Sequence, residues 1–454
     1  MSLHEMNVGS GVWIDGSINR FFESPDSMQS STTVPVNPTI PGYERYDVSL
    51  GGVISSPTFY GDENSSGCSF DILGVPNPHY KRTIGAEFEF LTPDAEKIVK
   101  HIAGDEIVSK GNVLIKGSKN SSTQKEGGNV SADGHRRVEI TTIPHTNEEF
   151  DYTQHESNER VINSLGAVLD ASMNTETALM TGCCDPNTGC TASIDLRMDF
   201  FDDADLDNVV NSMLGIAPIL SSFSEIGEDA KKRAKTFAGG YEYGCATGEN
   251  RKYYVRVDGK TGMTGNKTAE LRIVPMSKSI PVALGIEDMM YHYMKLVDTN
   301  PFEQYRNTVL TKKNNAEPYA KTNMLSVLED GLFSEVYEVI FGESNKKIAE
   351  NKGHEIIDSY EFMGVGAYTV KMPIVDAMEY NLEKLRENSD LPDSVYNTML
   401  NRIEEYRIQK NLETEAQNGD VVAQQILGNM ALMEEKDRYL VPEMDKDASQ
   451  MLYA

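Results

Sequence analysis

Two carboxylates share one face of a predicted strand near the start of the structured part of the chain. The segment reads Ile84-Gly-Ala-Glu-Phe-Glu-Phe-Leu91. Glu87 and Glu89 are two positions apart, so a β-strand points both to the same side, while Phe88 and Phe90 point to the other. Two negative charges this close are unfavourable unless a cation lies beside them, either a divalent metal or a Lys or Arg side chain. The alternative is an ordinary half-exposed strand without a site, which shows the same alternation of polar and apolar residues.

Similar acidic strands recur at two later points of the chain. The run from Arg137 to Thr142 alternates like a strand that presents Glu139. A third predicted strand carries Glu270 and Arg272 on one side, because they too are two positions apart. Glutamates gathered from several strands would form an oxygen-rich concavity suited to Mg²⁺ or Mn²⁺, and an arginine beside it suits a transferring phosphoryl group. Salt bridges between neighbouring strands are the alternative interpretation.

The order and spacing of these segments resemble the amidoligase and glutamate–cysteine ligase branch of the glutamine synthetase-like superfamily. The resembling segments span about 190 residues, from position 84 to position 275, and each motif is short. They are Gly85-Ala-Glu-Phe-Glu-Phe90, Asp133-Gly134 followed by Val138-Glu-Ile-Thr-Thr-Ile-Pro144, and Thr268-Ala-Glu-Leu-Arg272.

The resemblance implies an ATP-dependent ligase that joins a carboxylate to an amine through an acyl phosphate, with Mg²⁺ or Mn²⁺ bridging the phosphates. It implies that Arg272 contacts the γ-phosphate, that Asp133 positions substrate or metal, and that Thr268 belongs to the nucleotide site. The metal ligands that it implies are Glu87, Glu89, Glu139 and Glu270.

The chain departs from the family pattern at one strand. The family carries a histidine-containing strand between the second and third motifs, whereas this chain has Thr191 and Ser193 there. This departure leaves open the possibility that the chain is a degenerate member of the family, which binds ligands but does not catalyse a reaction. The basic cluster Lys231-Lys-Arg-Ala-Lys235 could supply phosphate contacts through Arg233 and Lys235, or it could be a solvated helix end.

Composition limits the classes of function that the chain can have. Its 454 residues carry a formal charge of −28, which argues against a nucleic-acid-binding surface because phosphate contacts need clustered cations. No apolar run reaches the roughly 18 residues of a membrane span, and the first residues lack a secretion signal. The chain has five cysteines, an odd number that does not suggest a framework of disulfide pairs, and this favours a reducing compartment. We expect a cytoplasmic protein, or a virion component under the alternative function below.

Periodicity predicts an α+β protein built on an antiparallel, glutamine synthetase-like sheet with helices packed on one face. A helix is expected to begin with Thr92 as N-cap, and longer helices are expected at 147–175, 203–225, 281–298, 323–342, 372–388 and from 393 to about 440. The predicted organisation is an irregular N-terminal arm (1–80), a ligase-like core (81–280), a helical continuation of that core (281–390) and a helical C-terminal region (391–454).

The leading functional hypothesis is therefore an ATP- and Mg²⁺-dependent amide-forming ligase that acts on an amino acid or peptide carboxylate and an amine. The alternative is a ligase-fold protein without turnover that serves a structural or assembly role, such as a virion or scaffold component. Under either hypothesis, residues 1–80 and the C-terminal helices could make oligomer or assembly contacts. No partner nucleic acid or membrane is expected, and the sequence contains no P-loop motif.

Overall fold

The computed structural model describes residues 82–441 with internal gaps, so the predicted arm at 1–80 lies outside the described residues. The remaining undescribed positions are 81, 104–111, 114–128, 134–135, 143–144, 147–149, 182, 186–189, 201–202, 225–239, 246–252, 262–266, 301, 304–322, 325, 328–333, 363, 438 and 442–454.

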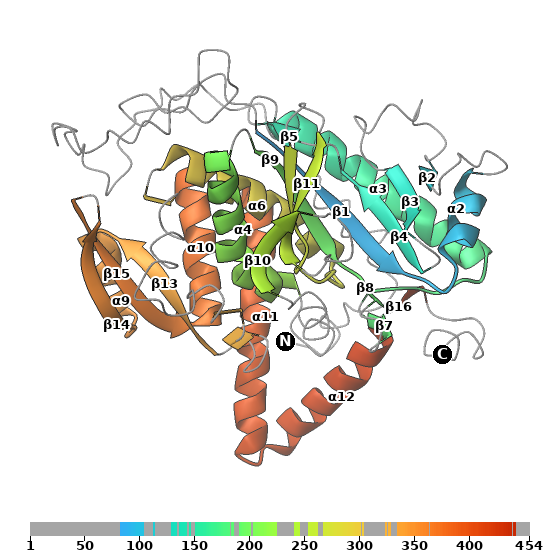
Figure 1. Ribbon diagram of the computed structural model, residues 1–454. Helices are drawn as coiled ribbons and strands as arrows, with labels where there is room; N and C mark the ends of the chain where they lie inside the picture. The colour runs from blue at the N-terminus through green and yellow to red at the C-terminus, as the bar shows by residue number, and fades with distance from the viewer. Residues whose placement is uncertain are drawn as a thin grey trace, which may run out of the picture.

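An eleven-stranded sheet forms the centre of the molecule, and β1 (Thr83–Leu91) lies in its middle (Figure 1). The main path runs β10-β11-β12-β9-β1-β4-β3-β2. Its pairs are antiparallel, apart from the parallel pair β10–β11. This arrangement confirms the predicted α+β class with an antiparallel sheet. The bounds are β2 (Asn112–Val113), β3 (Asn129–Asp133), β4 (Arg137–Thr141), β9 (Ile194–Phe200), β10 (Gly240–Cys245), β11 (Tyr253–Thr261) and β12 (Lys267–Leu271).

Short strands extend the sheet or pair beside it. Three of them lie off the main path, where β5 and β6 pair with β1, and β16 pairs with β6. Another two, β7 and β8, form a separate ribbon. Their bounds are β5 (His145–Thr146), β6 (Leu179–Met180), β7 (Cys183–Asp185), β8 (Cys190–Thr191) and β16 (Tyr439–Val441).

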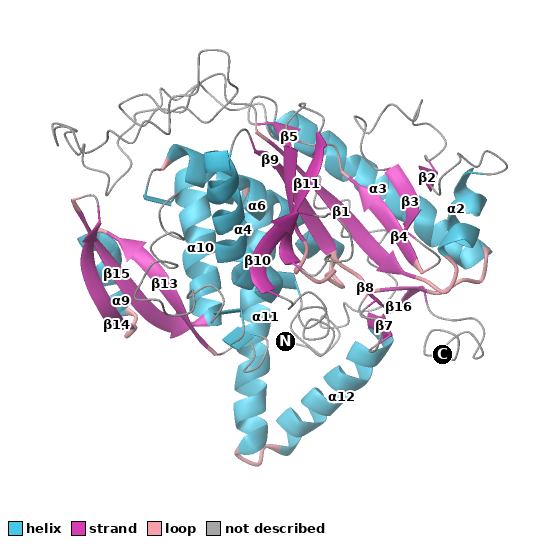
Figure 2. Ribbon diagram, in the orientation of Figure 1, coloured by secondary structure: helices cyan, strands magenta, loops and turns pink. Residues whose placement is uncertain are grey.

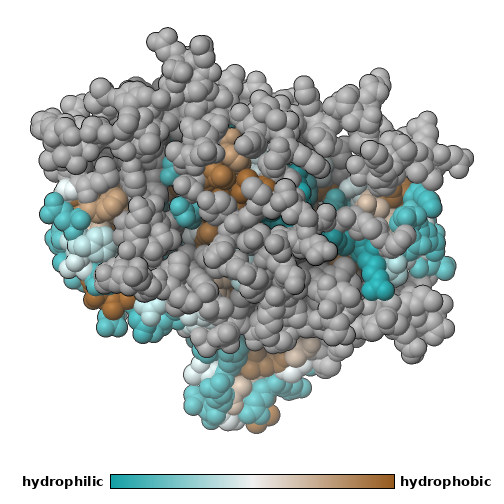
Figure 3. Space-filling view, viewed as in Figure 1, coloured by the Kyte–Doolittle hydropathy of each residue, from teal (hydrophilic) through white to brown (hydrophobic). Residues whose placement is uncertain are grey.

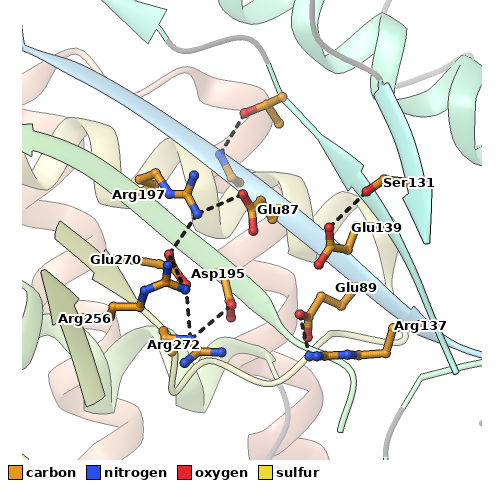
Figure 4. Close-up of polar contacts among 12 residues, drawn as sticks. Glu87, Glu89, Ser131, Arg137, Glu139, Asp195, Arg197, Arg256, Glu270 and Arg272 are labelled. Atoms are coloured by element: carbon orange, nitrogen blue, oxygen red, sulfur yellow. Dashed lines mark hydrogen bonds and ion pairs between the residues drawn. The ribbon is translucent and has the colours of Figure 1, made fainter. Parts of the chain in front are cut away.

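The two faces of the sheet differ in chemistry because side chains alternate along each strand. On one face Phe88, Phe90 and Ile140 are almost fully buried, and they line a common space with residues of α3 and α6. Burying a side chain of this size stabilises the fold by about 1.5–3 kcal/mol. Helices therefore cover the apolar face (Figure 2). The opposite face carries polar side chains (Figure 4). These helices are α3 (Phe150–Asn174), α4 (Asp203–Ser224) and α6 (Ile280–Thr299).

The helix predicted after β1 begins two residues later than expected. Helix α2 spans Ala95–Ala103, and the Asp94 carboxylate accepts a hydrogen bond from the backbone N–H of Lys97 at 3.0 Å. Asp94 therefore caps the helix, and the assignment of Thr92 as N-cap is wrong. Thr92 is fully buried, and its backbone N–H donates to the carbonyl of Arg136 in the turn before β4.

The region 281–390 is not a purely helical continuation, and the helix predicted at 323–342 is wrong. It contains a second antiparallel sheet in the order β13-β15-β14, visible at the left of Figure 1. The elements are β13 (Glu335–Phe341), α9 (Glu343–Asn351), β14 (Glu355–Phe362) and β15 (Val365–Pro373). The segment Glu335-Val-Tyr-Glu-Val-Ile-Phe341 is rich in β-branched and aromatic residues, which favour strands. The predicted domain boundaries themselves remain a prediction.

The C-terminal helices agree with the prediction. They are α10 (Ile374–Ser389), α11 (Asp393–Gln417) and α12 (Val421–Asp437). The Tyr406 hydroxyl of α11 donates to the Ser222 carbonyl at 2.8 Å and so holds α11 against the end of α4. Beyond this contact α11 extends away from the body and α12 runs back toward β16 (Figure 1). Apolar and polar surface intermix on this projecting pair of helices (Figure 3). In the part of the chain that the structure describes, no helix is long and apolar enough to cross a membrane.

Candidate functional site

Polar side chains from six neighbouring strands line the face of the central sheet that the apolar core does not use (Figure 4). The strand register brings them together, with Glu89 opposite Glu139, Glu87 opposite Asp195, and Glu270 between Arg197 and Arg256. We call this set the polar face. It comprises Glu87, Glu89, Ser131, Arg137, Glu139, Asp195, Arg197, Arg256, Glu270 and Arg272.

Glu270 contacts three arginines of the polar face. Its side chain is buried, and its oxygens lie 2.8 Å from Arg197 Nη2, 3.1 Å from Arg272 Nε and 3.8 Å from Arg256 Nη1. Arg272 also lies 3.6 Å from Asp195, which is buried as well. Buried carboxylates need such partners, because an uncompensated charge in the interior is strongly unfavourable.

Glu89 is held at the other side of β1. Arg137 Nη1 donates to it at 2.8 Å, and the Ser193 hydroxyl donates to its second oxygen. The backbone strengthens this contact, since the Glu89 N–H bonds to the Ser193 carbonyl at 2.9 Å. Ser193, one of the two residues at which the sequence departs from the histidine pattern, therefore has a role of its own. Its hydroxyl holds the Glu89 side chain of the polar face in place.

Glu87 occupies the middle of the polar face and has a strongly shifted pKa. Burial raises the pKa of Glu87 to about 8, Arg197 opposes this rise, and the carboxylates of Glu270, Glu139 and Asp195 add to it. Arg197 Nη2 lies 3.0 Å from a Glu87 oxygen. Strongly shifted carboxyl groups concentrate at functional sites, although ion-pair networks produce them as well.

The structure brings most of the predicted site residues together. Glu87, Glu89, Glu139, Glu270 and Arg272 all belong to the polar face. Their assigned roles remain predictions.

The other predicted residues lie elsewhere or are not described in full. Thr268 lies on β12 two residues before Glu270, opposite Asp199. Asp133 ends β3, opposite Arg137, and Thr191 ends β8. Arg233 and Lys235 lie outside the described residues. Their roles also remain predictions.

Four charged residues of the polar face were not predicted as site residues, namely Arg137, Asp195, Arg197 and Arg256. The local sequence could have indicated one pair of them. Asp195 and Arg197 are two positions apart in Ile194-Asp-Leu-Arg-Met198 and therefore share a strand face, as Glu270 and Arg272 do. Their convergence with Glu87 depends on strand pairing across more than a hundred positions, which no local pattern contains.

The polar face, as arranged, does not fit a divalent metal ion. Within the described ranges, no three His, Cys, Asp or Glu side chains lie close enough together to hold one. Glu139 accepts a hydrogen bond from Ser131 at 3.0 Å, and the other three predicted ligands contact guanidinium groups. The inter-strand salt bridges considered as the alternative interpretation are therefore present.

The polar face does fit phosphate chemistry. Arg197, Arg256 and Arg272 converge on the Glu270 carboxylate from three different strand positions. Guanidinium groups hold phosphoryl oxygens with the same planar, two-pronged geometry that they use for carboxylates. A phosphate that replaced the Glu270 contacts would therefore meet several donors on one surface.

No protein-family model matches the chain, and no curated protein matches it either. Among solved structures, the chain is similar to one from the crystal structure of the complex between the prokaryotic ubiquitin-like protein Pup and its ligase PafA. That likeness has 12% identity and a TM-score of 0.43, and it covers 82% of this chain and 77% of the other. A second similar structure is described as a novel glutamine synthase homolog, with 12% identity and a TM-score of 0.27, covering 54% of this chain and 70% of the other. At these identities and TM-scores, neither likeness assigns an activity or a substrate to this chain.

Proposed function

We propose that this protein is an ATP-dependent carboxylate–amine ligase whose reaction takes place on the polar face. The observation that supports the proposal best is the convergence of three sequence segments that lie far apart in the chain. The segments that contain Glu87, Glu139 and Glu270 resemble ligase motifs, and they occupy β1, β4 and β12 on the same face of one sheet.

The composition of this face supports a functional role more strongly than a purely structural one. Five carboxylates and four guanidinium groups gather there, and three of the carboxylates are almost fully buried. Replacing a buried ion pair with apolar side chains is often neutral or stabilising, so stability alone does not explain such an array. Ligand binding explains it, because the same groups can orient an anionic substrate.

The proposed reaction has two steps, and the polar face would act on both by holding charge in place. In the first step a substrate carboxylate oxygen attacks the γ-phosphorus of ATP, the bond to the bridging oxygen breaks, and ADP leaves. In the second step an amine nitrogen attacks the acyl carbon, and the amide forms as phosphate leaves and the amine loses a proton. Arg272, Arg256 and Arg197 would hold the phosphoryl oxygens and stabilise their developing charge.

A specific observation also favours a second candidate function. Glu87, Glu89 and Glu270 are already paired with arginines, which is what a ligase-fold protein that has lost turnover would show. In that case the polar face would be a stabilising network in a structural or assembly protein.

Turnover separates the two candidates. Purified full-length protein is supplied with ATP, Mg²⁺ and pooled amino acids or peptides, and the release of ADP and phosphate is followed together with amide products by mass spectrometry. The ligase proposal predicts amine-dependent release that Arg272→Ala lowers by at least about tenfold, because transition-state contacts are lost.

Arg386→Ala serves as the matched control, because Arg386 pairs with Asp393 on the distant helical region and its side chain is 45% exposed. This variant should keep the activity of the wild type. If the protein neither bound a nucleotide nor turned over any supplied amine, the ligase proposal would be contradicted and the structural candidate favoured.

A further inference from the structure

One guanidinium nitrogen lies between two carboxylates that the sequence motifs assign to a metal ion. Arg197 Nη2 is 3.0 Å from Glu87 Oε1 on β1 and 2.8 Å from Glu270 Oε2 on β12 (Figure 4). Arg197 itself belongs to β9, the strand between them. A positive charge built into the chain therefore bridges the two neighbouring strands.

The strand register explains how Arg197 reaches both partners. On one side it stands directly opposite Glu270, and on the other side directly opposite Gly85. Gly85 adds no side chain to the polar face, so the arginine can extend over β1 toward Glu87, two residues along on the same side. The bridge therefore depends on a glycine at one position and an arginine at another, in two different strands.

Two further guanidinium groups lie next to this bridge. Arg256 and Arg272 also contact Glu270, at 3.8 Å and 3.1 Å, so three guanidinium groups surround one buried carboxylate. A divalent ion between Glu87 and Glu270 would occupy the position of the Arg197 nitrogen and would be repelled by the remaining arginines. An ion between these two carboxylates and the observed position of Arg197 are mutually exclusive.

We propose that Arg197 takes the place of a divalent cation between Glu87 and Glu270, so that the polar face binds its anionic ligand without a protein-held metal. The proposal has two parts. The first, that Arg197 excludes a metal ion from this position, is independent of any activity. The second, that the polar face binds an anionic ligand without such a metal, rests on the proposed function, with ATP as the ligand.

Direct Mn²⁺ binding tests the first part without any turnover. Free Mn²⁺ is followed by electron paramagnetic resonance as full-length protein is added, for the wild type, Arg197→Ala, Arg197→Lys and the distant control Arg386→Ala. The proposal predicts that Arg197→Ala takes up Mn²⁺, because two carboxylates lose their shared cation. The other three proteins should leave the Mn²⁺ signal unchanged, since lysine keeps the charge in place.

Two results would overturn this part. One is saturable binding of Mn²⁺ to the wild type at micromolar concentration. This result would be decisive even if Arg197→Ala failed to fold, because it does not depend on the variant. The other is a folded Arg197→Ala variant, checked by circular dichroism, that takes up no Mn²⁺.

ATP binding, measured by calorimetry in EDTA and in Mg²⁺, tests the second part. The proposal predicts that the wild-type affinity for ATP differs by less than about threefold between the two conditions, whereas Arg197→Ala loses at least about tenfold in EDTA. Wild-type binding only in Mg²⁺ would overturn this part. Absence of ATP binding in both conditions would overturn it together with the proposed function, while the Mn²⁺ result would stand on its own.

Discussion

Glu270 is the residue on which the charge balance of the polar face depends most. Its buried carboxylate contacts Arg197, Arg256 and Arg272. Glu270→Ala should lower the free energy of unfolding by about 3 kcal/mol, the low end of the range for breaking a buried ion pair, since Arg197 and Arg272 keep other carboxylate partners. Chemical denaturation measures this loss.

The control for Glu270 is a glutamate in an exposed ion pair. Glu96 pairs with Lys100 at 3.3 Å on the surface of α2, where its side chain is 48% exposed. Glu96→Ala should change the stability by less than about 0.5 kcal/mol. Equal effects of the two substitutions would show that the polar face is not the desolvated network described above.

His292 gives a residue-scale prediction about pH. Burial lowers the pKa of His292 to about 4 from 6.5, while Lys295 lowers it further, and the Ser389 carbonyl and Asp390 oppose this. A depressed histidine pKa means that the unfolded chain binds the proton more readily, so stability is kept above pH 6.5 and lost as the pH falls toward 4. Between pH 7 and pH 5 this residue should remove about 2 kcal/mol.

The variant that isolates this effect is His292→Gln, which keeps an N–H donor for the Ser389 carbonyl, 2.5 Å from the His292 Nδ1. Its denaturation midpoint should fall less between pH 7 and pH 5 than that of the wild type. As a control, the same substitution at the exposed position His101 of α2 should leave the wild-type profile unchanged. A His292→Gln profile identical to the wild-type profile would contradict the prediction.

At the scale of elements, a buried chain of hydrogen bonds ties the central strand to the helix that covers it. The Ala86 N–H of β1 donates to the Thr142 hydroxyl at 2.7 Å, and this hydroxyl donates to Glu287 of α6 at 2.7 Å. Thr142→Val should destabilise the fold by about 2 kcal/mol, because it leaves a buried donor and a buried carboxylate oxygen without this partner. Thermal or chemical denaturation provides the measurement.

Thr142→Ser tests whether the hydroxyl itself is responsible. Serine keeps the hydroxyl and loses one methyl group, so it should retain most of the stability that valine removes. If the serine and valine variants were equally unstable, the packing of the methyl group and not the hydrogen-bond chain would connect β1 to α6.

The sequence predicted those elements whose two faces differ. Strands β1, β4 and β12 alternate between polar and apolar residues, so their period of two was visible, and α3, α4 and α6 showed the helical period. Strand β13 was missed because its residues from Glu338 to Phe341 are all buried, which removes the alternation. The arginine partners of the glutamates could not be predicted for a different reason, since they depend on which strands become neighbours.

At the scale of the whole molecule, the overall charge and the polar face respond differently to salt. The chain has a net charge of −28, whereas the polar face nearly balances its charges and includes ion pairs at 2.8 Å. Salt screens long-range repulsion between exposed charges far more than it screens buried pairs. Raising NaCl should therefore raise the thermal midpoint of unfolding, and a falling midpoint would show that ion pairs dominate the salt response.

The central claim is that the polar face transfers a phosphoryl group to a carboxylate, and an oxygen-isotope experiment tests it most directly. Substrate carboxylates labelled with ¹⁸O are supplied with ATP and the amine pool, and the released phosphate is analysed by mass spectrometry. Acyl-phosphate chemistry transfers one labelled oxygen from the carboxylate to the phosphate, so we predict labelled phosphate from the wild type and at least about tenfold less of it from Arg272→Ala in the same time. Unlabelled phosphate released by the wild type would identify simple ATP hydrolysis and contradict the account.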